Sequence, residues 1–417
     1  ATLGAVLPAL SAYRRSSREQ SMVDGWRYRV VWRPVGEVAG GSLSGTWLVV
    51  VPASCAGDEL VAGVVSGLGR HGVDVVSLVV DEGDLDVGVL GERLGRAVAD
   101  VSELGGVLSL LALDEGPCSG YPVLSSGFAL SLMLVRGLVE VGVEGLLWCV
   151  SRGAVSVGRS DRLAGVVQSQ VWGLGRVVGL EQSAVWGGLV DLPEVLDERA
   201  VGRLVGVLSG GGGGEDQVAV RGSGVFVRRL TRSAASVADG TTWRVRGSVL
   251  VTGGTGALGA RVARWVVGQG AEHLVLTSRR GVEAPGASEL CEELEALGVG
   301  VTVVACDVSD REQLGAVLDA VPGEFPLRAV FHAAGVEQAV ELAGMSLADA
   351  AGVVSGKAAG AGHLDALLGD RELDAFVVFS SIAGVWGSGG QAAYGAANAY
   401  LDALVEDRRA RGLAGTA

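Results

Sequence analysis

Three side chains in the C-terminal quarter of the chain, Ser381, Tyr394 and Lys357, could together deliver a proton to a carbonyl oxygen. Reducing a ketone adds hydride to carbon and a proton to oxygen, so the reaction needs a positioned acid. A phenol can donate that proton, although its ordinary pKa of about 10 makes it a weak acid at neutral pH. A nearby ammonium assists because it stabilises the phenolate left behind. A serine hydroxyl can hold the charge that develops on the oxygen.

Each of these residues also has an ordinary structural interpretation. Tyr394 could be a packed aromatic side chain, Ser381 a cap at the end of a strand, and Lys357 a solvated position on a helix.

A glycine-rich turn at 251–259, VTGGTGALG, lies between an apolar strand and an amphipathic helix. Gly253 permits the sharp turn, Gly256 lets the backbone approach a pyrophosphate, and Gly259 lets helix and strand pack closely. The phosphates would lie at the helix N-terminus, where free N–H groups favour anions. The alternative, a simple tight turn, stays open because the chain contains 68 glycines. The phosphate contacts are predicted at Gly253, Thr255, Gly256, Ala257 and Leu258.

The end of the second strand of this half favours NADPH over NADH. NAD-binding folds usually place Asp or Glu there to bind the ribose 2′-hydroxyl. Here Ser278 and Arg279 occupy the position, and a guanidinium can bind a 2′-phosphate through two hydrogen bonds. A solvated arginine at a strand end is the alternative. The remaining predicted cofactor contacts are Asp307 near the adenine, Val308 beside it in the sequence, and Ala333, Ala334 and Gly335 near the nicotinamide ribose.

Apolar runs typical of buried strands alternate with helical segments in both halves of the chain. This alternation predicts an α/β protein of two Rossmann-like units, each a doubly wound parallel sheet. We expect an interdomain linker at 1–20, a first unit at 21–235 and a second unit at 236–417, with 232–243 as the connection between the units. The strands are expected at 46–53, 73–80, 106–113 and 145–151, then at 248–254, 273–279, 301–308, 327–335 and 375–381.

Composition excludes several classes of function. The formal net charge of −14 argues against a nucleic-acid partner, since phosphate contacts need clustered Lys and Arg. No apolar stretch is long enough to predict a membrane span, and the N-terminus lacks the order of a secretory signal. The 5 cysteines and 4 histidines show no metal-ligand spacing, so we predict no metal site. These features predict a cytoplasmic location.

Several long strings resemble the short-chain dehydrogenase/reductase superfamily, and more closely the ketoreductase domains of modular polyketide synthases. They are VTGGTGALGARVAR, LVLTSRRG, ACDVSDRE, VFHAAGV and FSSIAGVWGSGGQAAYGAANAYLDAL, with WGLGRVVGLE and WGGLVDLP in the first half. The resemblance extends from about Trp26 to Ala417. It implies that only the second unit binds NADPH. It also implies that the first unit is a structural subdomain replacing the partner subunit of dimeric reductases, so the isolated domain is expected to be monomeric.

One departure from the wider superfamily supports the narrower resemblance. The superfamily places Lys four residues after the catalytic Tyr, where this chain has Asn398. Polyketide ketoreductases show this exchange and carry the Lys upstream, where Lys357 lies. The resemblance therefore implies a catalytic set of Tyr394, Ser381, Lys357 and Asn398, in which Lys357 also binds the nicotinamide ribose and Asn398 organises the proton relay.

By the same resemblance, the substrate is a β-ketoacyl chain on the phosphopantetheine arm of an acyl carrier protein, and the partners are the other domains of the synthase. Members that give a D-hydroxyl carry Leu-Asp-Asp where this chain has Glu337, Gln338 and Ala339. A-type members, which give an L-hydroxyl, carry a Trp where Trp386 lies. Gln391 replaces the His of epimerising A-type members, which predicts subclass A1. Trp386 packed only for stability is the alternative.

Two other functions stay open at this point: a redox-inactive relative that epimerises or only positions the substrate, and a purely structural Rossmann-like scaffold. The sequence printed ends at Ala417, before the further strand and the substrate-covering lid that the family carries. From the sequence we therefore expect neither the strand nor the lid.

Overall fold

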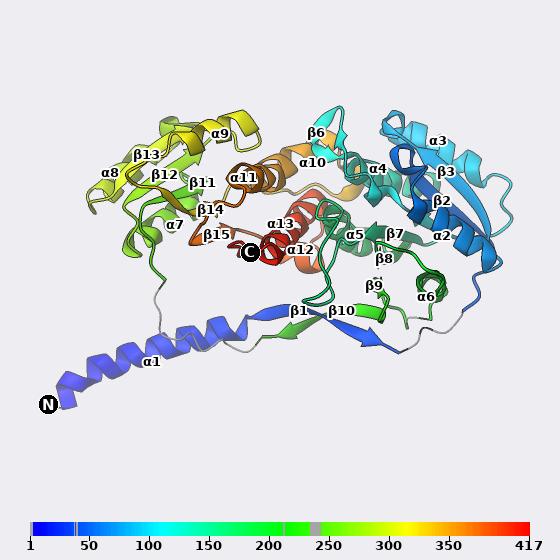
Figure 1. Cartoon of the computed structure of the whole chain (residues 1–417), viewed down its shortest axis with the longest axis horizontal. Helices are drawn as coiled ribbons and strands as arrows, with labels where there is room; N and C mark the ends of the chain where they lie inside the picture. The colour runs from blue at the N-terminus through cyan, green and yellow to red at the C-terminus, as the bar shows by residue number, and fades with distance from the viewer. Residues whose placement is uncertain (1–2, 37, 39–40, 212, 234–242) are drawn as a thin grey trace.

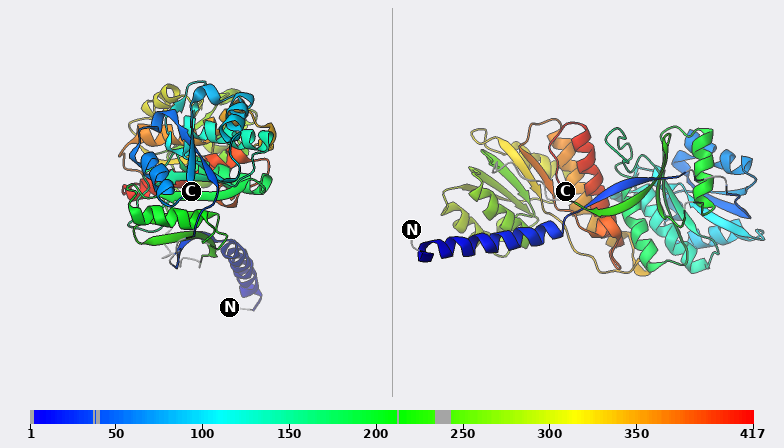
Figure 2. Two further views of the ribbon diagram at one scale, coloured as in Figure 1. Left: turned by 90° about the vertical axis from the view of Figure 1, so that its right-hand side faces the viewer. Right: turned by 90° about the horizontal axis from the view of Figure 1, so that it is seen from below.

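The computed structural model describes residues 3–36, 38, 41–211, 213–233 and 243–417. Two sheets lie on either side of the segment 234–242, and they define a first unit (residues 28–232) and a second unit (residues 243–417). Ahead of both sheets, residues 3–25 form one helix, α1 (Leu3–Gly25), which extends away from the body of the molecule (Figures 1 and 2). The linker expected at 1–20 is thus helical where it is described, and the expected boundary at 20 falls inside this helix.

The first unit contains an eight-stranded sheet of order β1-β10-β9-β8-β7-β4-β2-β3. Six of its strands, β9 to β3 in that order, are parallel to one another, while β10 is antiparallel to both β9 and β1. The strands are β1 (Tyr28–Val35), β2 (Thr46–Pro52), β3 (Asp74–Val80), β4 (Leu104–Ser109), β7 (Leu147–Arg152), β8 (Trp186–Leu192), β9 (Gln217–Arg221) and β10 (Gly224–Arg232). A separate small hairpin is formed by β5 (Pro117–Cys118) and β6 (Tyr121–Ser125).

Helices cover both faces of this sheet. One face packs against α2 (Glu59–Arg70) and α6 (Glu198–Leu208), and the other against α3 (Val87–Val98), α4 (Ser126–Val141) and α5 (Ser169–Glu181). The first unit is therefore a doubly wound sheet as predicted, extended at one edge by an antiparallel pair that was not predicted. The sequence interpretation missed β1, β8, β9 and β10.

The second unit contains a five-stranded parallel sheet of order β13-β12-β11-β14-β15. Its strands are β11 (Ser248–Thr252), β12 (His273–Ser278), β13 (Gly300–Ala305), β14 (Leu327–His332) and β15 (Ala375–Val378). One face packs against α7 (Ala257–Gly268) and α8 (Ala287–Glu295), and the other against α9 (Arg311–Asp319), α11 (Gly360–Leu368) and α13 (Ala392–Ala410). All five expected strands are present. The strand order reverses between β11 and β14, and a ligand crevice is expected at the carboxyl ends of these two strands.

The final residues form an isolated β-bridge with the edge of this sheet. Thr416 pairs in parallel with Val377, and its N–H donates to the carbonyl of Phe376 at 2.8 Å. One bridge is too short to be a strand, so the expectation that neither the further strand nor the lid follows β15 stays a prediction.

The two units share a hydrophobic core. One cluster of buried residues combines side chains of α4 and α5 with those of α10 (Leu347–Val354) and α13. Where α5 meets α13, a Cβ added to Gly173 would lie 2.3 Å from the carbonyl oxygen of Gly395. Only glycine therefore fits at position 173, and the helix that carries Tyr394 is packed directly against the first unit.

Candidate active site

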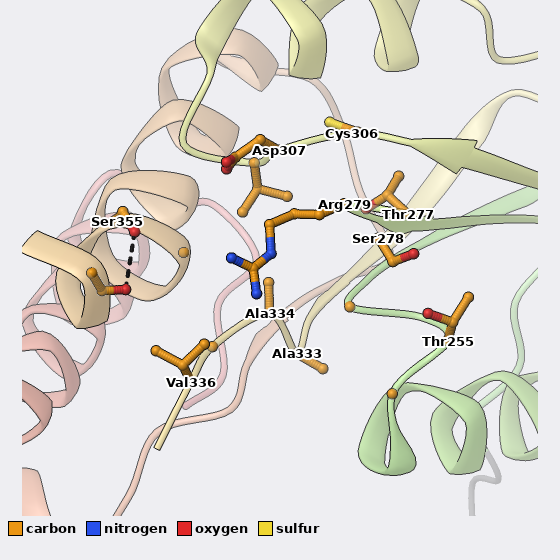
Figure 3. A pocket seen from close by; sticks show the side chains of 16 residues that line it. Thr255, Thr277, Ser278, Arg279, Cys306, Asp307, Ala333, Ala334, Val336 and Ser355 are labelled. Carbon is orange, nitrogen blue, oxygen red and sulfur yellow. Dashed lines mark hydrogen bonds between the residues drawn. The ribbon is translucent and has the colours of Figure 1, made fainter. Parts of the chain in front are cut away.

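A pocket lies at the carboxyl ends of β11, β12 and β14, where the strand order predicts a ligand crevice (Figure 3). Ten of the predicted cofactor contacts line this pocket: Gly253, Thr255, Gly256, Ser278, Arg279, Asp307, Val308, Ala333, Ala334 and Gly335. The two other predicted contacts, Ala257 and Leu258, are the first residues of α7 beside it. The pocket is also lined by residues not predicted: Thr277, Cys306, Val336, Gly352, Ser355 and Gly356.

The glycines of the turn have steric reasons to be glycine. Gly253 has φ +65°, and a Cβ there would lie 3.0 Å from the backbone of Ala333. A Cβ on Gly259 would lie 2.2 Å from the carbonyl oxygen of Gly253, so α7 packs closely on the turn. The N-cap of α7 is Gly256, and no side chain among the described residues caps the helix. Its first N–H groups are thus left to face an anion.

Two side chains suit a phosphorylated ribose at the end of β12. The guanidinium of Arg279 is directed into the pocket (Figure 3), and among the described residues it has no ion-pair partner. The Thr277 hydroxyl is buried without a hydrogen-bond partner in the described part of the chain. Thr277 and Arg279 line the same pocket, and a buried hydroxyl and a guanidinium that both lack partners among the described residues fit a ligand that accepts hydrogen bonds and carries negative charge.

Lys357 lies in a one-turn π-helix, η6 (Ser355–Ala359), inserted between α10 and α11. Such insertions free backbone groups from the regular helical pattern. The Lys357 carbonyl contacts Nε2 of His332 at 2.8 Å, and Nδ1 of His332 contacts the Thr252 hydroxyl at 2.7 Å. Burial lowers the pKa of His332 to about 4, so this imidazole is neutral at pH 7. The buried histidine thereby fastens the lysine turn to strands β14 and β11.

The Lys357 ammonium is buried and joins two of the other predicted catalytic residues. Its Nζ donates to Asn398 Oδ1 at 3.1 Å and to the Phe379 carbonyl at 2.6 Å, and it lies 5.0 Å from the centre of the Tyr394 ring. Asn398 Nδ2 donates in turn to the Tyr394 carbonyl at 2.7 Å. Burial lowers the pKa of Lys357 to about 8, and the negative charge of Asp402 opposes that shift.

The backbone of Tyr394 is hydrogen-bonded to Gln338. In the sequence, Gln338 is notable only because it stands where members that give a D-hydroxyl carry the Leu-Asp-Asp motif. The N–H of Tyr394 donates to Oε1 of buried Gln338 at 2.9 Å, and Gln391 Nε2 donates to the Gln338 carbonyl at 3.3 Å. Gln338 therefore satisfies one of the free N–H groups at the start of α13. No local signal in the sequence pairs these residues, since they are 56 positions apart.

Ser381 lies between β15 and the short helix α12 (Ala383–Trp386), just before the N-cap residue Ile382. The Ser381 hydroxyl accepts a hydrogen bond from the Ala383 N–H at 3.3 Å. In this structure, Ser381 therefore caps the chain after a strand, as its ordinary structural interpretation predicted. Ser381 is two residues beyond Phe379, the acceptor of the Lys357 ammonium. Trp386 ends α12 and is 54% exposed.

The loops that flank these residues are joined to the first unit by one carboxylate. Glu181, at the end of α5, accepts from the Leu342 N–H and from the Gly390 N–H, each at 2.7 Å. The Val340 N–H donates to the Gly390 carbonyl at 3.0 Å. The loop after β14 and the loop before α13 are thus held together near the start of α13, the helix that carries Tyr394.

Comparison with known proteins decides the family. The family model for the KR domain matches residues 247–417, and that for the Rossmann fold domain of polyketide synthase extender module SpnB matches 127–230. A solved A-type ketoreductase from a modular polyketide synthase is 47% identical with a TM-score of 0.90, over 94% of this chain and 82% of that chain. The chain is a ketoreductase domain of the modular polyketide synthase family.

Curated relatives of this ketoreductase domain are much longer proteins. Polyketide synthase GfsA of Streptomyces halstedii is 50% identical over 99% of this chain, which covers 6% of that protein. The pikromycin polyketide synthase component PikAIII of Streptomyces venezuelae is 45% identical over 95% of this chain, which covers 24% of that protein. A solved A1-type ketoreductase likewise shows 47% identity and a TM-score of 0.90, over 94% of this chain and 82% of that chain. The family assignment confirms the fold class and the oxidoreductase class that the sequence predicted.

No helix among the described residues is long and apolar enough to cross a membrane. The described residues also contain no group of three or more His, Cys, Asp or Glu side chains placed to hold a metal ion.

Proposed function

We propose that this domain uses NADPH to reduce a β-ketoacyl chain carried by an acyl carrier protein to an L-β-hydroxyacyl thioester. The observation that carries the proposal is the Lys357 ammonium, which contacts Asn398 and lies beside the Tyr394 ring. Gly335 lines the cofactor pocket, and a Cβ there would lie 3.2 Å from Lys357 Cε. The acid and the cofactor pocket therefore meet at Lys357.

Different residues bind the cofactor and transfer the proton. Bound NADPH supplies the hydride. Arg279 and Thr277 hold the 2′-phosphate, and the start of α7 faces the pyrophosphate. Lys357 uses two of its three N–H groups on Phe379 and Asn398, which leaves one for a ribose hydroxyl. Tyr394 donates the proton to the carbonyl oxygen, and Ser381 turns its hydroxyl toward the same oxygen.

Support for the L-hydroxyl prediction comes from sequence and relatives together. Trp386 occupies the position of the A-type tryptophan and is exposed on α12, and Gln391, in place of the His of epimerising A-type members, is the N-cap of α13. Solved A-type and A1-type ketoreductases are 47% identical to this chain. The bulky ring beside the site would bias the direction of substrate entry, and so the carbonyl face that meets the hydride.

The function is tested by incubating the domain with NADPH and a soluble β-ketoacyl thioester. We expect loss of absorbance at 340 nm and, on chiral chromatography, the L-β-hydroxy product. A domain that consumes no NADPH, with this thioester or with trans-1-decalone, would be the redox-inactive relative. The intact Lys357–Asn398 contact argues against that alternative. The carrier protein, the other synthase domains and a monomeric state remain part of this proposal.

Arg279→Asp is expected to reverse the cofactor preference. The carboxylate would repel the 2′-phosphate and accept from a 2′-hydroxyl instead. We expect kcat/KM for NADPH to fall by about 100-fold while that for NADH rises. The neighbouring change Arg280→Asp is the control, because Arg280 does not line the pocket. Equal losses from the two variants would show that Arg279 does not bind the 2′-phosphate.

A further inference from the structure

In the part of the chain that the structure describes, two carbonyl groups of the short helix α12 lack a backbone hydrogen-bond donor. Within this turn, N–H groups bond to the carbonyls of Ser381, Ile382 and Ala383. The carbonyls of Gly384 and Val385 receive no backbone hydrogen bond from the described residues. Carbonyls at the end of a helix need partners from elsewhere.

Both partners come from the first unit. Arg176 of α5 donates from Nη1 to the Gly384 carbonyl, and Arg228 of β10 donates from Nη1 to the Val385 carbonyl at 2.7 Å. Gln217 Oε1 fixes the pair, because it accepts from Arg176 Nε at 3.0 Å and from Arg228 Nη1 at 3.3 Å. Cations at a helix C-terminus also suit its negative dipole end.

The two guanidiniums are held in a cavity between the units. The cavity is lined by Trp172, Arg176, Arg228 and Asp402, among others. Arg176 stacks over Trp172 with its Cζ 5.7 Å from the ring centre. The negative charge of Asp402 acts on both arginines and offsets their mutual repulsion. Burying two guanidinium charges beside one short helix costs free energy. Apolar side chains could pack against the helix without that cost, so the arginines have more than a packing role.

The position of α12 matters to both the acid and the stereocontrol residue. A Cβ on Gly384 would lie 2.9 Å from Asn398 Cβ, so the helix packs directly on the catalytic asparagine. Trp386 is 54% exposed, so much of its ring lacks packing that would fix it. Its direction therefore depends on the backbone of α12. Gly387, with φ +84°, ends the helix, and a Cβ there would lie 2.8 Å from the Arg176 carbonyl.

We propose that Arg176 and Arg228 are positioning residues for stereocontrol: by holding the Gly384 and Val385 carbonyls, they fix Trp386 and so the ketone face presented to hydride. This inference rests on the proposed function, in which Trp386 biases substrate entry. It gives the first unit a part in selectivity as well as in stability.

The test measures the ratio of L to D product from a soluble β-ketoacyl thioester with Arg176→Gln, Arg228→Gln and Trp386→Ala. We expect each arginine variant to lower the ratio by about tenfold, as a lost charged hydrogen bond would. Their kcat should fall less than the ratio does, because Tyr394 and Lys357 keep their contacts. Trp386→Ala should lower the ratio at least as far.

Arg221→Gln is the matched control. Arg221 is a buried arginine of the first unit, but it pairs with Asp161 and Asp191, and within the described part of the chain it forms no bond to the second unit. It should lower the melting temperature and leave the product ratio unchanged. A wild-type ratio in both arginine variants overturns the inference, as does an equal loss of ratio in Arg221→Gln. A wild-type enzyme that gives D product, or none, overturns the proposed function instead.

If the glutamine variants do not fold, Arg176→Lys and Arg228→Lys retain a cation in the cavity but lose the planar fork. We then expect faster hydrogen exchange of the amides in 383–387 together with a lower product ratio. Unchanged exchange and an unchanged ratio in these variants overturn the inference.

Discussion

Replacing Tyr394 with phenylalanine is expected to lower kcat for ketone reduction by about 10²–10⁴-fold, the usual contribution of a positioned general acid. The variant removes one oxygen atom and leaves the ring beside the Lys357 ammonium, 5.0 Å from its centre. The backbone bond from the Tyr394 N–H to Gln338 is also retained. The KM for NADPH should therefore change little, since the loss falls on the chemical step.

A second tyrosine on the same helix provides the control for this prediction. Tyr400 also lies on α13, and burial raises the pKa of its phenol to about 12, so it is a poor acid. Tyr400→Phe should keep kcat within a few-fold of the wild type. Single-turnover measurements with pre-bound NADPH separate chemistry from release. Comparable rates for Tyr394→Phe and the wild type would remove Tyr394 from the acid role.

The second large effect is expected at Lys357, both on substitution and on titration. Lys357→Met should lower kcat/KM by about 100-fold or more, because the ammonium that stabilises the phenolate is lost. With the pKa of Lys357 lowered to about 8 by burial, the wild-type ammonium should lose its proton as the pH rises through 8. We therefore expect kcat/KM to be level from pH 6 to 7 and to fall above about pH 8.

Two features make this pH profile informative. The neighbouring His332 has its pKa lowered to about 4 by burial, so it does not titrate in the same range.

The free energy of unfolding should change with pH in the opposite direction to the activity. The unfolded chain binds the lysine proton more tightly than the folded chain between about pH 8 and the ordinary lysine value of about 10.4, so this group favours folding more as pH rises through that window.

The profile is measured as kcat/KM from pH 6 to 10, with thermal unfolding recorded across the same range. Lys357→Met should lack the activity step near pH 8, and its unfolding should lose the dependence on pH that this lysine contributes. A wild-type rate that stays level to pH 10 would contradict the need for a protonated Lys357.

Much of the second unit could be predicted because its signals are local. Strands buried on both faces, such as β11 and β12, appear as continuous apolar runs. The glycine spacing at 253, 256 and 259 is read within one turn, where a Cβ on Gly259 would lie 2.2 Å from the Gly253 carbonyl oxygen. Ten of twelve predicted cofactor contacts line the pocket for the same reason: they follow the ends of strands that the sequence marks. The catalytic set rested on a family resemblance and remains a proposal.

The first unit shows where local patterns fail. β8 contains two glycines, WGGLVDL, and β1 is a largely exposed edge strand, YRVVWRPV, so neither has a continuous apolar run. β1 is completed only by β10, which lies about 200 residues later in the chain and pairs Tyr28 with Arg232. Such pairing brings together two segments far apart in the chain, so it cannot be predicted from either segment alone.

The sequence by itself determined the two sheets in outline, the cofactor turn and the candidate acid with its lysine. Only the tertiary structure decided how these are held. The Lys357 turn depends on His332, the start of α13 on Gln338, and the flanking loops on Glu181. Likewise, α12 depends on Arg176 and Arg228 of the other unit. These are hydrogen bonds between side chains and distant backbone groups. Nearly every residue carries the same backbone N–H and C=O groups, so the sequence does not show which of them a side chain will bind.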